Sequence, residues 1–339
     1  MKLEDFNYQL PKELIAQHPL EKRDESRLLV VDRRSRNIEH KKFHDLLHYV
    51  KDGDLLVVNN ARVKPARLLG KRGTGGKAEI LLLDNIDVNI YKALIKPRPK
   101  IKEGDVIYFD EKKITATVLK KGSSENIVLF KGIDNIERCL REIGITPLPP
   151  YIKREATERD RERYQTIYAE REVAVASPTA GLHFTDELMK MIVSKGATFA
   201  SVTLNVGYDT FRPVRDIYNH RMHSEVLDIP IATANLINSV KRGRGKIVGI
   251  GTTVCRTLES MYNNGRVKHG SNRTDLFIKP PYEFKVIDSL VTNFHLPRTS
   301  LIMLVSAFVA DTKFLLDVYR EAVKERYRFY SYGDAMLIL

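Results

Sequence analysis

Three short stretches of the sequence combine histidine or glycine with hydroxyl side chains, and these residue types could act together on a ligand. His183 lies in Ala-Ser-Pro-Thr-Ala-Gly-Leu-His-Phe-Thr (176–185), and His295 lies in Thr-Asn-Phe-His-Leu-Pro (292–297). In the third, Gly-Ile-Gly-Thr-Thr (249–253), glycines let a ligand approach the backbone and threonines offer hydroxyls. Imidazole titrates near neutral pH and serves as a general acid or base. The pattern predicts acid–base chemistry on a nucleoside or carboxylate ligand; for each histidine, a structural role is the alternative.

A fourth group, His-Arg-Met-His-Ser-Glu (220–225), places two imidazoles and a carboxylate close together in the sequence. The order His-Glu-x-x-His, typical of zinc enzymes, is absent, so we expect no metal here. His223 and Glu225 are interpreted instead as assisting acid–base groups.

Other catalytic patterns are missing from the sequence. Val254 occupies the third glycine position of the dinucleotide fingerprint, which argues against an NAD site. The sequence has no Gly-x-x-x-x-Gly-Lys-Ser/Thr loop and no Gly-x-Ser-x-Gly elbow. Hydrolysis of nucleoside triphosphates and covalent hydrolysis through serine are therefore disfavoured.

Each loop that could carry chemistry follows a segment with the composition of a buried strand. Between the first two such strands, Thr185 can cap a helix that has an acidic first turn and stops at Gly196. Strand, loop, helix and strand in this order predict a crossover that joins parallel strands. We therefore expect four loops at the carboxyl ends of strands of one sheet, where open α/β sheets bind ligands. The strands are predicted at 173–176, 198–204, 246–249 and 284–291, and the loops at 177–185, 205–213, 249–253 and 292–300.

The sequence pattern changes from Ala61 to about Ile143, where a short β-rich piece recurs about every ten residues. These pieces are separated by turns such as Gly-Thr-Gly-Gly and Gly-Ser-Ser, which is typical of a small antiparallel barrel. A helix at 135–143 closes it. The pieces lie at 66–70, 79–83, 88–95, 106–109, 114–119 and 127–130. We therefore predict an α/β main domain with a mixed sheet, formed by 1–60 and 151–339, and an inserted antiparallel β-barrel domain at 61–150.

The charge of the chain indicates a polyanionic partner. Its 339 residues include 56 Lys and Arg against 43 Asp and Glu, a formal net charge of +13. Such an excess favours nucleic acid, although a generally lysine-rich surface is the alternative. The cations cluster in the predicted barrel and in Lys-Arg-Gly-Arg-Gly-Lys (241–246). The residues expected to contact RNA phosphates are Arg62, Lys64, Arg67, Lys71, Arg72, Lys241, Arg242 and Arg244.

The sequence carries no signal for a membrane or for secretion. No apolar run approaches the roughly 20 residues that span a bilayer, and Met1–Leu10 lacks the apolar core of a secretory signal. Cys139 and Cys255 suggest neither a disulfide framework nor a zinc site. We expect a cytoplasmic protein and, because no long apolar helix face is left over, a monomer.

Four longer strings resemble a known family, the S-adenosylmethionine:tRNA ribosyltransferase-isomerases of queuosine biosynthesis. They are Arg-Val-Lys-Pro-Ala-Arg-Leu (62–68), Pro-Thr-Ala-Gly-Leu-His-Phe-Thr (178–185), Thr-Asn-Phe-His-Leu-Pro (292–297) and Tyr-Ser-Tyr-Gly-Asp-Ala-Met (330–336). Shorter strings such as Pro-Leu-Pro-Pro-Tyr (147–151) agree, so the likeness covers the whole chain. Asn205 departs from the histidine usual in the family, and no acid–base role is expected there.

The resemblance implies a reaction that needs no cofactor and uses S-adenosylmethionine as a ribosyl donor. The ribose is transferred to the 7-aminomethyl-7-deazaguanine at the wobble position of tRNA and rearranged, giving epoxyqueuosine-tRNA, adenine and methionine. Because the sulfonium acidifies the C5′ hydrogens, one base can start ring opening, and an acid can assist the departure of adenine. We expect His183 and His295 to be the base and the acid, in an order that the sequence does not reveal, assisted by His223 and Glu225. The residues expected to bind S-adenosylmethionine are Thr179, Gly181, Gly251, Thr252 and Thr253.

Two other functions remain open from the residues alone. An S-adenosylmethionine-dependent RNA methyltransferase would release S-adenosylhomocysteine in place of adenine and methionine. A non-catalytic RNA-binding module would bind without turnover, although four histidine- or glycine-bearing loops at one sheet edge are more than a binding platform needs. It would also have the base-stacking aromatic pairs of a recognition-motif sheet, which the sequence lacks.

Overall fold

The structure is a computed structural model that describes residues 1–109, 113–207 and 214–339. The chain forms two compact units. The main unit contains 1–62, 150–154 and 163–339, and the barrel unit contains 63–149 and 155–162. Residues 155–162 therefore group with the barrel, whereas the sequence pattern assigns them to the α/β domain. Of the predicted loop 205–213, residues 208–213 lie outside the described part of the chain.

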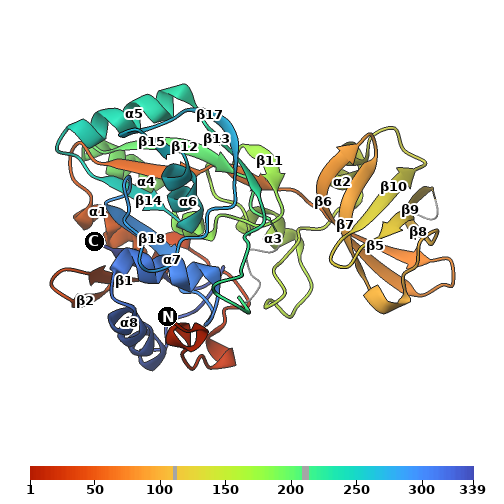
Figure 1. Cartoon of the computed structure of the whole chain (residues 1–339), viewed down its shortest axis with the longest axis horizontal. Helices are drawn as coiled ribbons and strands as arrows, with labels where there is room; N and C mark the ends of the chain where they lie inside the picture. Colours follow the sequence, from red (N-terminus) through yellow and green to blue (C-terminus); the bar gives the residue numbers. More distant parts are fainter. Residues whose placement is uncertain (110–112, 208–213) are drawn as a thin grey trace. The chain divides into compact units, whose positions relative to one another are not determined.

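A nine-stranded mixed sheet forms the centre of the main unit (Figure 1). In spatial order its strands are β17 (Gly270–Thr274), β13 (Glu225–Ile229), β12 (Thr198–Leu204), β3 (Leu55–Asn59), β14 (Ile247–Ile250), β18 (Ser289–Asn293), β19 (Ala335–Ile338), β1 (Arg27–Asp32) and β2 (Asn37–Lys42). The neighbours β12, β3, β14 and β18 are parallel to one another, and β1 is parallel to β19. The remaining pairs are antiparallel. The carboxyl ends of four adjacent strands therefore meet at one edge.

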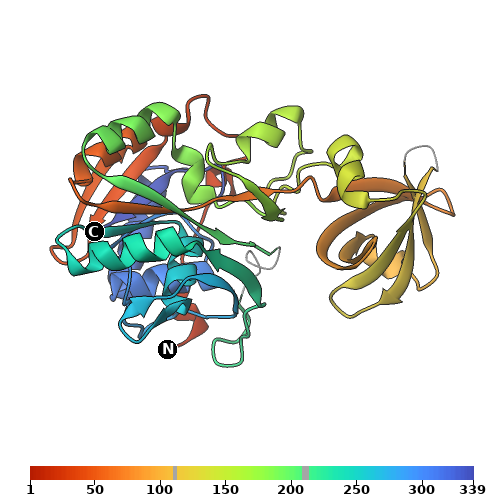
Figure 2. The ribbon, with the colours of Figure 1, turned by 90° about the horizontal axis from the view of Figure 1, so that it is seen from above.

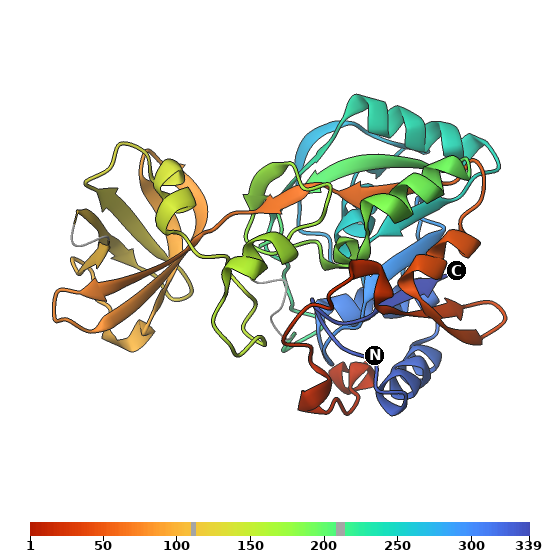
Figure 3. The same cartoon turned by 180° about the vertical axis from the view of Figure 1, so that it is seen from behind.

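Helices cover both faces of this sheet (Figures 2 and 3). One face packs against α1 (Leu46–Tyr49) and α4 (Asp186–Ser194), and the other against α5 (Ile231–Arg242), α6 (Thr252–Ser260), α7 (Ser300–Val309) and α8 (Thr312–Lys324). Successive residues of β3 alternate between these two cores: Leu55 joins the second core and Leu56 the first. A strand has a side-chain period of two, so a strand covered on both faces must be apolar at every position.

Side chains that cap helix starts position several site segments. The Thr185 hydroxyl accepts a hydrogen bond from the Leu188 amide at 3.2 Å and begins α4 as predicted. The Thr299 hydroxyl accepts one from the Ile302 amide at the start of α7. Each cap satisfies a helix-start amide that has no partner within the helix. Short 3₁₀ turns form η1 (Leu3–Phe6), η2 (Lys12–Leu14), η3 (Arg23–Glu25), η4 (Phe43–Asp45) and η7 (Thr179–His183), and a two-stranded hairpin joins β15 (Tyr262–Asn263) to β16 (Arg266–Val267).

The barrel unit is a closed antiparallel barrel with the strand order β10-β7-β6-β5-β8-β9. All six predicted strands are present, and the buried apolar residues of β9 (Ile114, Ala116 and Val118) alternate with half-buried threonines. The fold class predicted from the sequence is thus confirmed. The elements are β5 (Arg67–Arg72), β6 (Lys77–Asp87), β7 (Ile90–Lys96), η5 (Arg98–Lys100), β8 (Val106–Phe109), β9 (Ile114–Lys121), β10 (Asn126–Lys131), α2 (Ile136–Ile143) and α3 (Glu158–Arg163).

Two local predictions are wrong. β11 (Arg171–Ala174) pairs with β4 (Ala61–Val63) in a separate two-stranded sheet, so the loop before α4 is not a crossover within the main sheet. A four-residue strand such as β11, Arg-Glu-Val-Ala, carries no local signal of which sheet it joins. The stretch 153–172, whose evenly mixed charges predict a solvated helix, is helical only over α3, and Tyr164 and Thr166 within it are buried. Separately, no helix in 1–109, 113–207 and 214–339 has the length and apolarity that a bilayer crossing requires.

Candidate functional site

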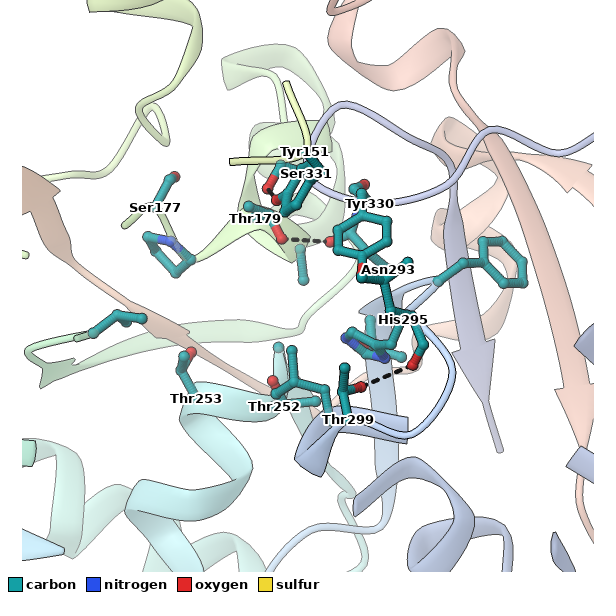
Figure 4. A pocket seen from close by; sticks show the side chains of 18 residues that line it. Tyr151, Ser177, Thr179, Thr252, Thr253, Asn293, His295, Thr299, Tyr330 and Ser331 are labelled. Carbon is teal, nitrogen blue, oxygen red and sulfur yellow. Dashed lines mark hydrogen bonds between the residues drawn. The ribbon is translucent and has the colours of Figure 1, made fainter. Parts of the chain in front are cut away.

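A cavity lies at the carboxyl edge of the parallel strands (Figure 4). Gly251–Thr253 follow β14, Thr292–Leu296 lie at the end of β18, and Val206 lies just beyond β12. The segment 177–180, which leads into η7, completes the wall together with Tyr330. The space between these side chains, open solvent included, is about 610 Å³. Three of the four predicted strand ends therefore contribute to one site, and the segment after β11 reaches it from outside the main sheet.

The side chains that line this cavity carry no formal charge. Among the described lining residues there is no Asp, Glu, Lys or Arg, and His295 is the one histidine. The lining residues are Tyr151, Ser177, Pro178, Thr179, Ala180, Val206, Gly251, Thr252, Thr253, Thr292, Asn293, Phe294, His295, Leu296, Thr299, Leu301, Tyr330 and Ser331. Hydroxyls, one amide and apolar surface suit a neutral, hydrogen-bonding ligand such as a nucleoside, and do not suit a polyphosphate.

Several buried polar atoms of this lining lack a hydrogen-bond partner within the described residues. They are Ser177 Oγ, Thr253 Oγ1, His295 Nδ1 and the Tyr330 hydroxyl. A buried polar group without a partner costs roughly 1–3 kcal/mol, and such groups are uncommon in folded proteins. Four in one cavity, on four different segments (Figure 4), indicate a ligand whose polar atoms complete them.

Hydrogen bonds to its backbone hold His295 in place, and its ring lines the cavity. Its amide donates to the Tyr319 hydroxyl and its carbonyl accepts from the Tyr8 hydroxyl. The ring is 8% exposed, and its Nε2 lies 3.4 Å from the Thr292 hydroxyl. Burial lowers the pKa of His295 from 6.5 to about 3, so the imidazole is neutral at physiological pH. A neutral imidazole offers one N–H and one lone pair to a ligand.

His183 is equally buried, but both of its ring nitrogens are occupied. Nδ1 lies 2.7 Å from the Ser26 hydroxyl and Nε2 lies 3.1 Å from the Asn293 amide nitrogen. The ring stacks on Phe43 at 4.9 Å. Burial, with smaller contributions from Arg23 and Arg328, lowers the pKa of His183 to about 3. His183 does not line the cavity of His295, and its predicted role as an acid or base has no open nitrogen to support it.

The side chain of Asn293 determines which atoms donate and which accept in its hydrogen bonds with His183 and Thr179. Its amide nitrogen also faces the carbonyls of Tyr330 and Asp334, which identifies that atom as the donor. His183 Nε2 must therefore accept, and Nδ1–H donates to Ser26, whose hydroxyl donates to the Arg23 carbonyl. On the other side, the Thr179 hydroxyl donates to Asn293 Oδ1 at 2.9 Å. The Thr179 hydroxyl can therefore act only as a hydrogen-bond acceptor toward the cavity.

The two glycines predicted to bind S-adenosylmethionine have different surroundings. Gly251 has φ +99° and begins α6, a conformation that L side chains rarely adopt. It lines the cavity with Thr252 and Thr253. Gly181 does not line it: a Cβ there would lie 2.0 Å from the Tyr168 hydroxyl, so this glycine is explained by packing.

Some lining residues were missed by sequence reasoning. Tyr330 has φ +72°, uncommon for a tyrosine, and its ring centroid lies 4.0 Å from that of Tyr151. Non-glycine residues held in this region cost roughly 1–3 kcal/mol and cluster at ligand sites. The motif Tyr-Gly-Asp at 332–334 is the signal that could have found it. Asp334 explains the motif: its carboxylate accepts from the amides of Arg27 and Arg328 and fixes the turn that carries Tyr330.

Glu225 and His223 lie away from this cavity. Glu225 is 7% exposed and forms a buried ion pair with Arg256, and its other oxygen accepts from the Gly207 amide at 3.0 Å. A carboxylate committed to a buried guanidinium is poorly placed to accept a proton. His223 is exposed. Neither residue lines the cavity, so the predicted assisting roles have no geometric support; Glu225 instead positions the backbone beside Val206.

In the barrel unit, some of the basic residues predicted to contact RNA already form ion pairs within the protein. Lys64 Nζ lies 3.0 Å from Glu137 Oε1, and Arg67 Nη2 lies 2.7 Å from Glu79 Oε2. Arg72 is half-buried, whereas Lys71 is exposed. In the main unit, Arg62 donates to the Ala169 carbonyl.

The second predicted basic group lies at the other edge of the main sheet. Lys241, Arg242 and Arg244 are exposed and come between α5 and β14. They therefore lie at the amino end of β14, whereas the cavity lies at its carboxyl end. Lys241 also donates to the Lys285 carbonyl.

The fold and the cavity define a class: an α/β protein with an inserted barrel and an uncharged ligand site at the carboxyl ends of parallel strands. A family model described as "Queuosine biosynthesis protein" matches residues 3–338. The chain therefore belongs to the queuosine biosynthesis protein family, and the resemblance drawn from the four strings is confirmed.

Individual relatives agree over full length. A protein of Thermotoga maritima named S-adenosylmethionine:tRNA ribosyltransferase-isomerase is 48% identical over 342 residues, which cover 100% of both chains. One of the same name from Acetivibrio thermocellus is 49% identical over 343 residues, again with 100% coverage. The crystal structure of S-adenosylmethionine tRNA ribosyltransferase from T. maritima aligns with a TM-score of 0.58 and 39% identity, covering 99% of this chain and 100% of that one.

Proposed function

We propose that this chain is an S-adenosylmethionine:tRNA ribosyltransferase-isomerase. It transfers the ribosyl moiety of S-adenosylmethionine to 7-aminomethyl-7-deazaguanine at the wobble position of tRNA and isomerises it, giving epoxyqueuosine-tRNA, adenine and methionine. Full-length identity of 48% to a relative with this name supports the activity. The observation in the molecule that carries it is the uncharged cavity with four unpartnered polar atoms. We further propose that the enzyme is a cytoplasmic monomer and needs no cofactor besides the co-substrate.

The adenosine part of S-adenosylmethionine is the part that matches this cavity. Adenine and ribose are neutral and present both donors and acceptors, as do Ser177, Thr253 and Tyr330. Thr179 offers lone pairs because its proton goes to Asn293, so it suits a ribose hydroxyl or an amino group. Gly251–Thr253 provide amides at the start of α6. Thr179, Gly251, Thr252 and Thr253 thus keep their predicted role, whereas Gly181 supports the loop from behind.

His295 is proposed to act on the departing adenine as a hydrogen-bond donor. A histidine with a pKa of about 3 is a poor base at neutral pH. If the Thr292 hydroxyl donates to Nε2, the proton resides on Nδ1, the atom that lacks a partner. A positioned N–H stabilises negative charge that develops on the adenine ring as the glycosidic bond breaks. The acid–base role predicted for His295 becomes that of a neutral donor, and His183 becomes a positioning residue.

The decisive experiment follows the fate of the co-substrate. The protein is incubated with S-adenosylmethionine labelled in the ribose and tRNA that bears the 7-aminomethyl-7-deazaguanine precursor. We expect label in the tRNA, with free adenine and methionine released in equal amounts. Release of S-adenosylhomocysteine would identify a methyltransferase, and tight tRNA binding without any product would identify a binding module.

Binding of tRNA is proposed to involve exposed cations, and its salt dependence tests this. Neutralised phosphates release counterions, so affinity falls steeply as salt rises. Replacing an exposed cation such as Lys71 or Arg242 with Gln should weaken binding and lower the salt slope by about one if that cation contacts a phosphate. A salt-independent dissociation constant would argue against phosphate contacts altogether.

A further inference from the structure

The Tyr-Gly-Asp motif that ends at Asp334 forms a turn whose backbone is held by hydrogen bonds. The Asp334 carboxylate accepts from the amides of Arg27 and Arg328, at 2.9 and 2.7 Å. The Gly333 amide donates to the Tyr330 carbonyl at 2.8 Å. A Cβ on Gly333 would lie 2.5 Å from the Arg328 carbonyl oxygen, so glycine is required there. The turn therefore presents its carbonyl groups at fixed positions.

Two carbonyls of this turn orient the side-chain amide of Asn293. Asn293 Nδ2 lies 3.2 Å from the Tyr330 carbonyl oxygen and 3.4 Å from that of Asp334. The opposite orientation would bring Oδ1 against these two carbonyls, and none of the three oxygens could donate. Asn293 is 3% exposed, so water does not offer an alternative partner. The turn thus determines which end of the amide faces Thr179, namely Oδ1.

The Asn293 amide in turn fixes the proton of a hydroxyl in the uncharged cavity. Oδ1 accepts from the Thr179 hydroxyl at 2.9 Å (Figure 4), and this is the one proton that the hydroxyl has. Thr179 is half-buried in the cavity lining, with its lone pairs left for a ligand. A ligand that covers Thr179 must therefore offer it a donor, or leave a buried acceptor without a partner, which is unfavourable.

Other hydroxyls of the lining are less restrictive. Ser177 Oγ and Thr253 Oγ1 have no hydrogen-bond partner among the described residues, so each can turn its proton toward or away from a ligand. The Thr299 hydroxyl already donates and accepts within the protein. Thr179, in contrast, is set to accept, so it can discriminate between a ligand group that donates and one that does not.

We propose that Asn293 is a positioning residue that holds Thr179 as an acceptor, and that the pair selects the co-substrate by a hydrogen-bond donor of its adenosine part. The inference rests on the proposed function, which supplies S-adenosylmethionine as the ligand. Adenosine carries such donors in two places, the exocyclic amino group of adenine and the hydroxyls of the ribose. A site built to hydrogen-bond one of these groups rejects an analogue that lacks it, because the protein partner is then left unpaired.

The test measures binding apart from chemistry, with S-adenosylmethionine and analogues that each lack one donor. These are the 2′-deoxy, 3′-deoxy and 6-deamino forms, and their Kd values are measured by calorimetry with the full chain and tRNA that carries guanine at the wobble position. This tRNA lacks the reacting aminomethyl group, so no transfer occurs. We expect removal of one donor to raise the Kd of the wild type by about tenfold or more. In Thr179→Val the same removal should change the Kd by less than about twofold, which identifies the group that Thr179 binds.

Asn293→Ala tests the positioning role through a reversal that partial unfolding cannot imitate. Without Oδ1 the Thr179 hydroxyl can turn and donate, so an analogue with an acceptor in place of the identified donor should now bind. This analogue is the 6-oxo form for the amino group, or the corresponding deoxyfluoro form for a ribose hydroxyl. We expect the wild-type preference for S-adenosylmethionine over this analogue, about tenfold or more, to fall below about threefold. Thr179→Val leaves the hydrogen bonds of Asn293 to the turn in place, so it gives an answer even if Asn293→Ala folds poorly.

Thr203→Val is the matched control. Its hydroxyl also donates to a side-chain oxygen of an asparagine, Asn60 Oδ1, at 2.7 Å, but Thr203 lies on β12 and does not line the cavity. Its Kd ratios should match those of the wild type within about twofold. Equal ratios in wild type and Thr179→Val would overturn the proposal, as would a preference that survives unchanged in Asn293→Ala. Failure of S-adenosylmethionine itself to bind would instead contradict the proposed function, and this inference with it.

Discussion

The two buried histidines of the main unit look alike by burial and differ by hydrogen bonding. His183 and His295 are 4% and 8% exposed, and burial lowers the pKa of each to about 3. His183 uses both ring nitrogens within the protein, toward Ser26 and Asn293. His295 leaves Nδ1 without a partner among the described residues and lines the uncharged cavity.

This comparison teaches that a perturbed pKa does not by itself mark a reacting group. Desolvation acts on both rings regardless of purpose, because it disfavours the charged imidazolium. Their hydrogen bonding is what separates them: among the described residues both ring nitrogens of His183 have partners, whereas Nδ1 of His295 has none and can bond a ligand. We infer that His183 builds the site and that His295 meets the substrate.

The largest expected effect is that of His295→Ala on turnover. Loss of one positioned donor to a developing negative charge lowers kcat by about 10²–10³-fold. Rates are measured from adenine release at saturating S-adenosylmethionine and tRNA. The substitution also removes a buried ring and the partner of the Thr292 hydroxyl, so urea unfolding is measured in parallel and rates are compared at a temperature where the variant stays folded. A turnover within about threefold of wild type would remove His295 from the chemistry.

The second expected effect is a loss of stability in acid to which both histidines contribute. Each is neutral in the folded state down to a pKa of about 3, while the unfolded chain takes up a proton below 6.5. The unfolded state then binds more protons, so the free energy of unfolding falls as pH drops from 6.5 toward 3. The slope is about 1.4 kcal/mol per pH unit for each histidine. Urea unfolding at pH 7, 6 and 5 measures it.

The matched variants His183→Gln and His295→Gln sharpen this test. Each should remove about one histidine's share of the slope, and the double variant should remove both. Carboxylates also titrate at lower pH, which is why the measurement stops at pH 5. An unchanged slope in either single variant would mean that the corresponding ring is protonated in the folded protein.

The fold was predictable because its signals are local and repeated. Alternating short β pieces with glycine turns indicate the barrel, and continuous apolar strands such as β3 indicate a sheet covered on both faces. The pairing of β11 with β4 was not predictable, since it joins residues 171–174 to 61–63 across the whole barrel insertion. Strand pairing at such distances depends on the packed structure and leaves no local trace.

The sequence indicated which segments form the candidate site, but not which role each residue has there. Gly251 and His295 were found because glycine and histidine at strand ends have specific uses. Asn293 and Tyr330 were missed because their importance lies in hydrogen bonds to segments remote in sequence, such as Asn293 to His183. For the same reason His183 and Glu225 were assigned to chemistry from residue type, whereas their partners, Asn293 and Arg256, indicate positioning roles.

A smaller effect, chiefly on stability, is expected for His183→Ala. The substitution leaves the Asn293 and Ser26 groups without partners and removes the ring stacked on Phe43. We expect a loss of about 2–3 kcal/mol in the free energy of unfolding, measured by urea denaturation. At a temperature where the variant stays folded, kcat should fall less than tenfold. A loss as large as that of His295→Ala, with unchanged stability, would make His183 the reacting group and reverse the comparison.

The smallest expected effect is that of Thr292→Val, which probes how the His295 tautomer is set. The Thr292 hydroxyl lies 3.4 Å from His295 Nε2, a long and therefore weak hydrogen bond. Its loss should lower kcat by about two- to fivefold, because a hydrogen bond of this kind contributes roughly 0.5–1 kcal/mol. Thr233→Val is the matched control, since that hydroxyl is also bonded, to the Ser201 carbonyl, but lies on α5 away from the cavity. If Thr292→Val lowers kcat as much as His295→Ala does, the hydroxyl itself contacts the substrate, and the availability of His295 Nδ1 is not the feature that distinguishes the two histidines.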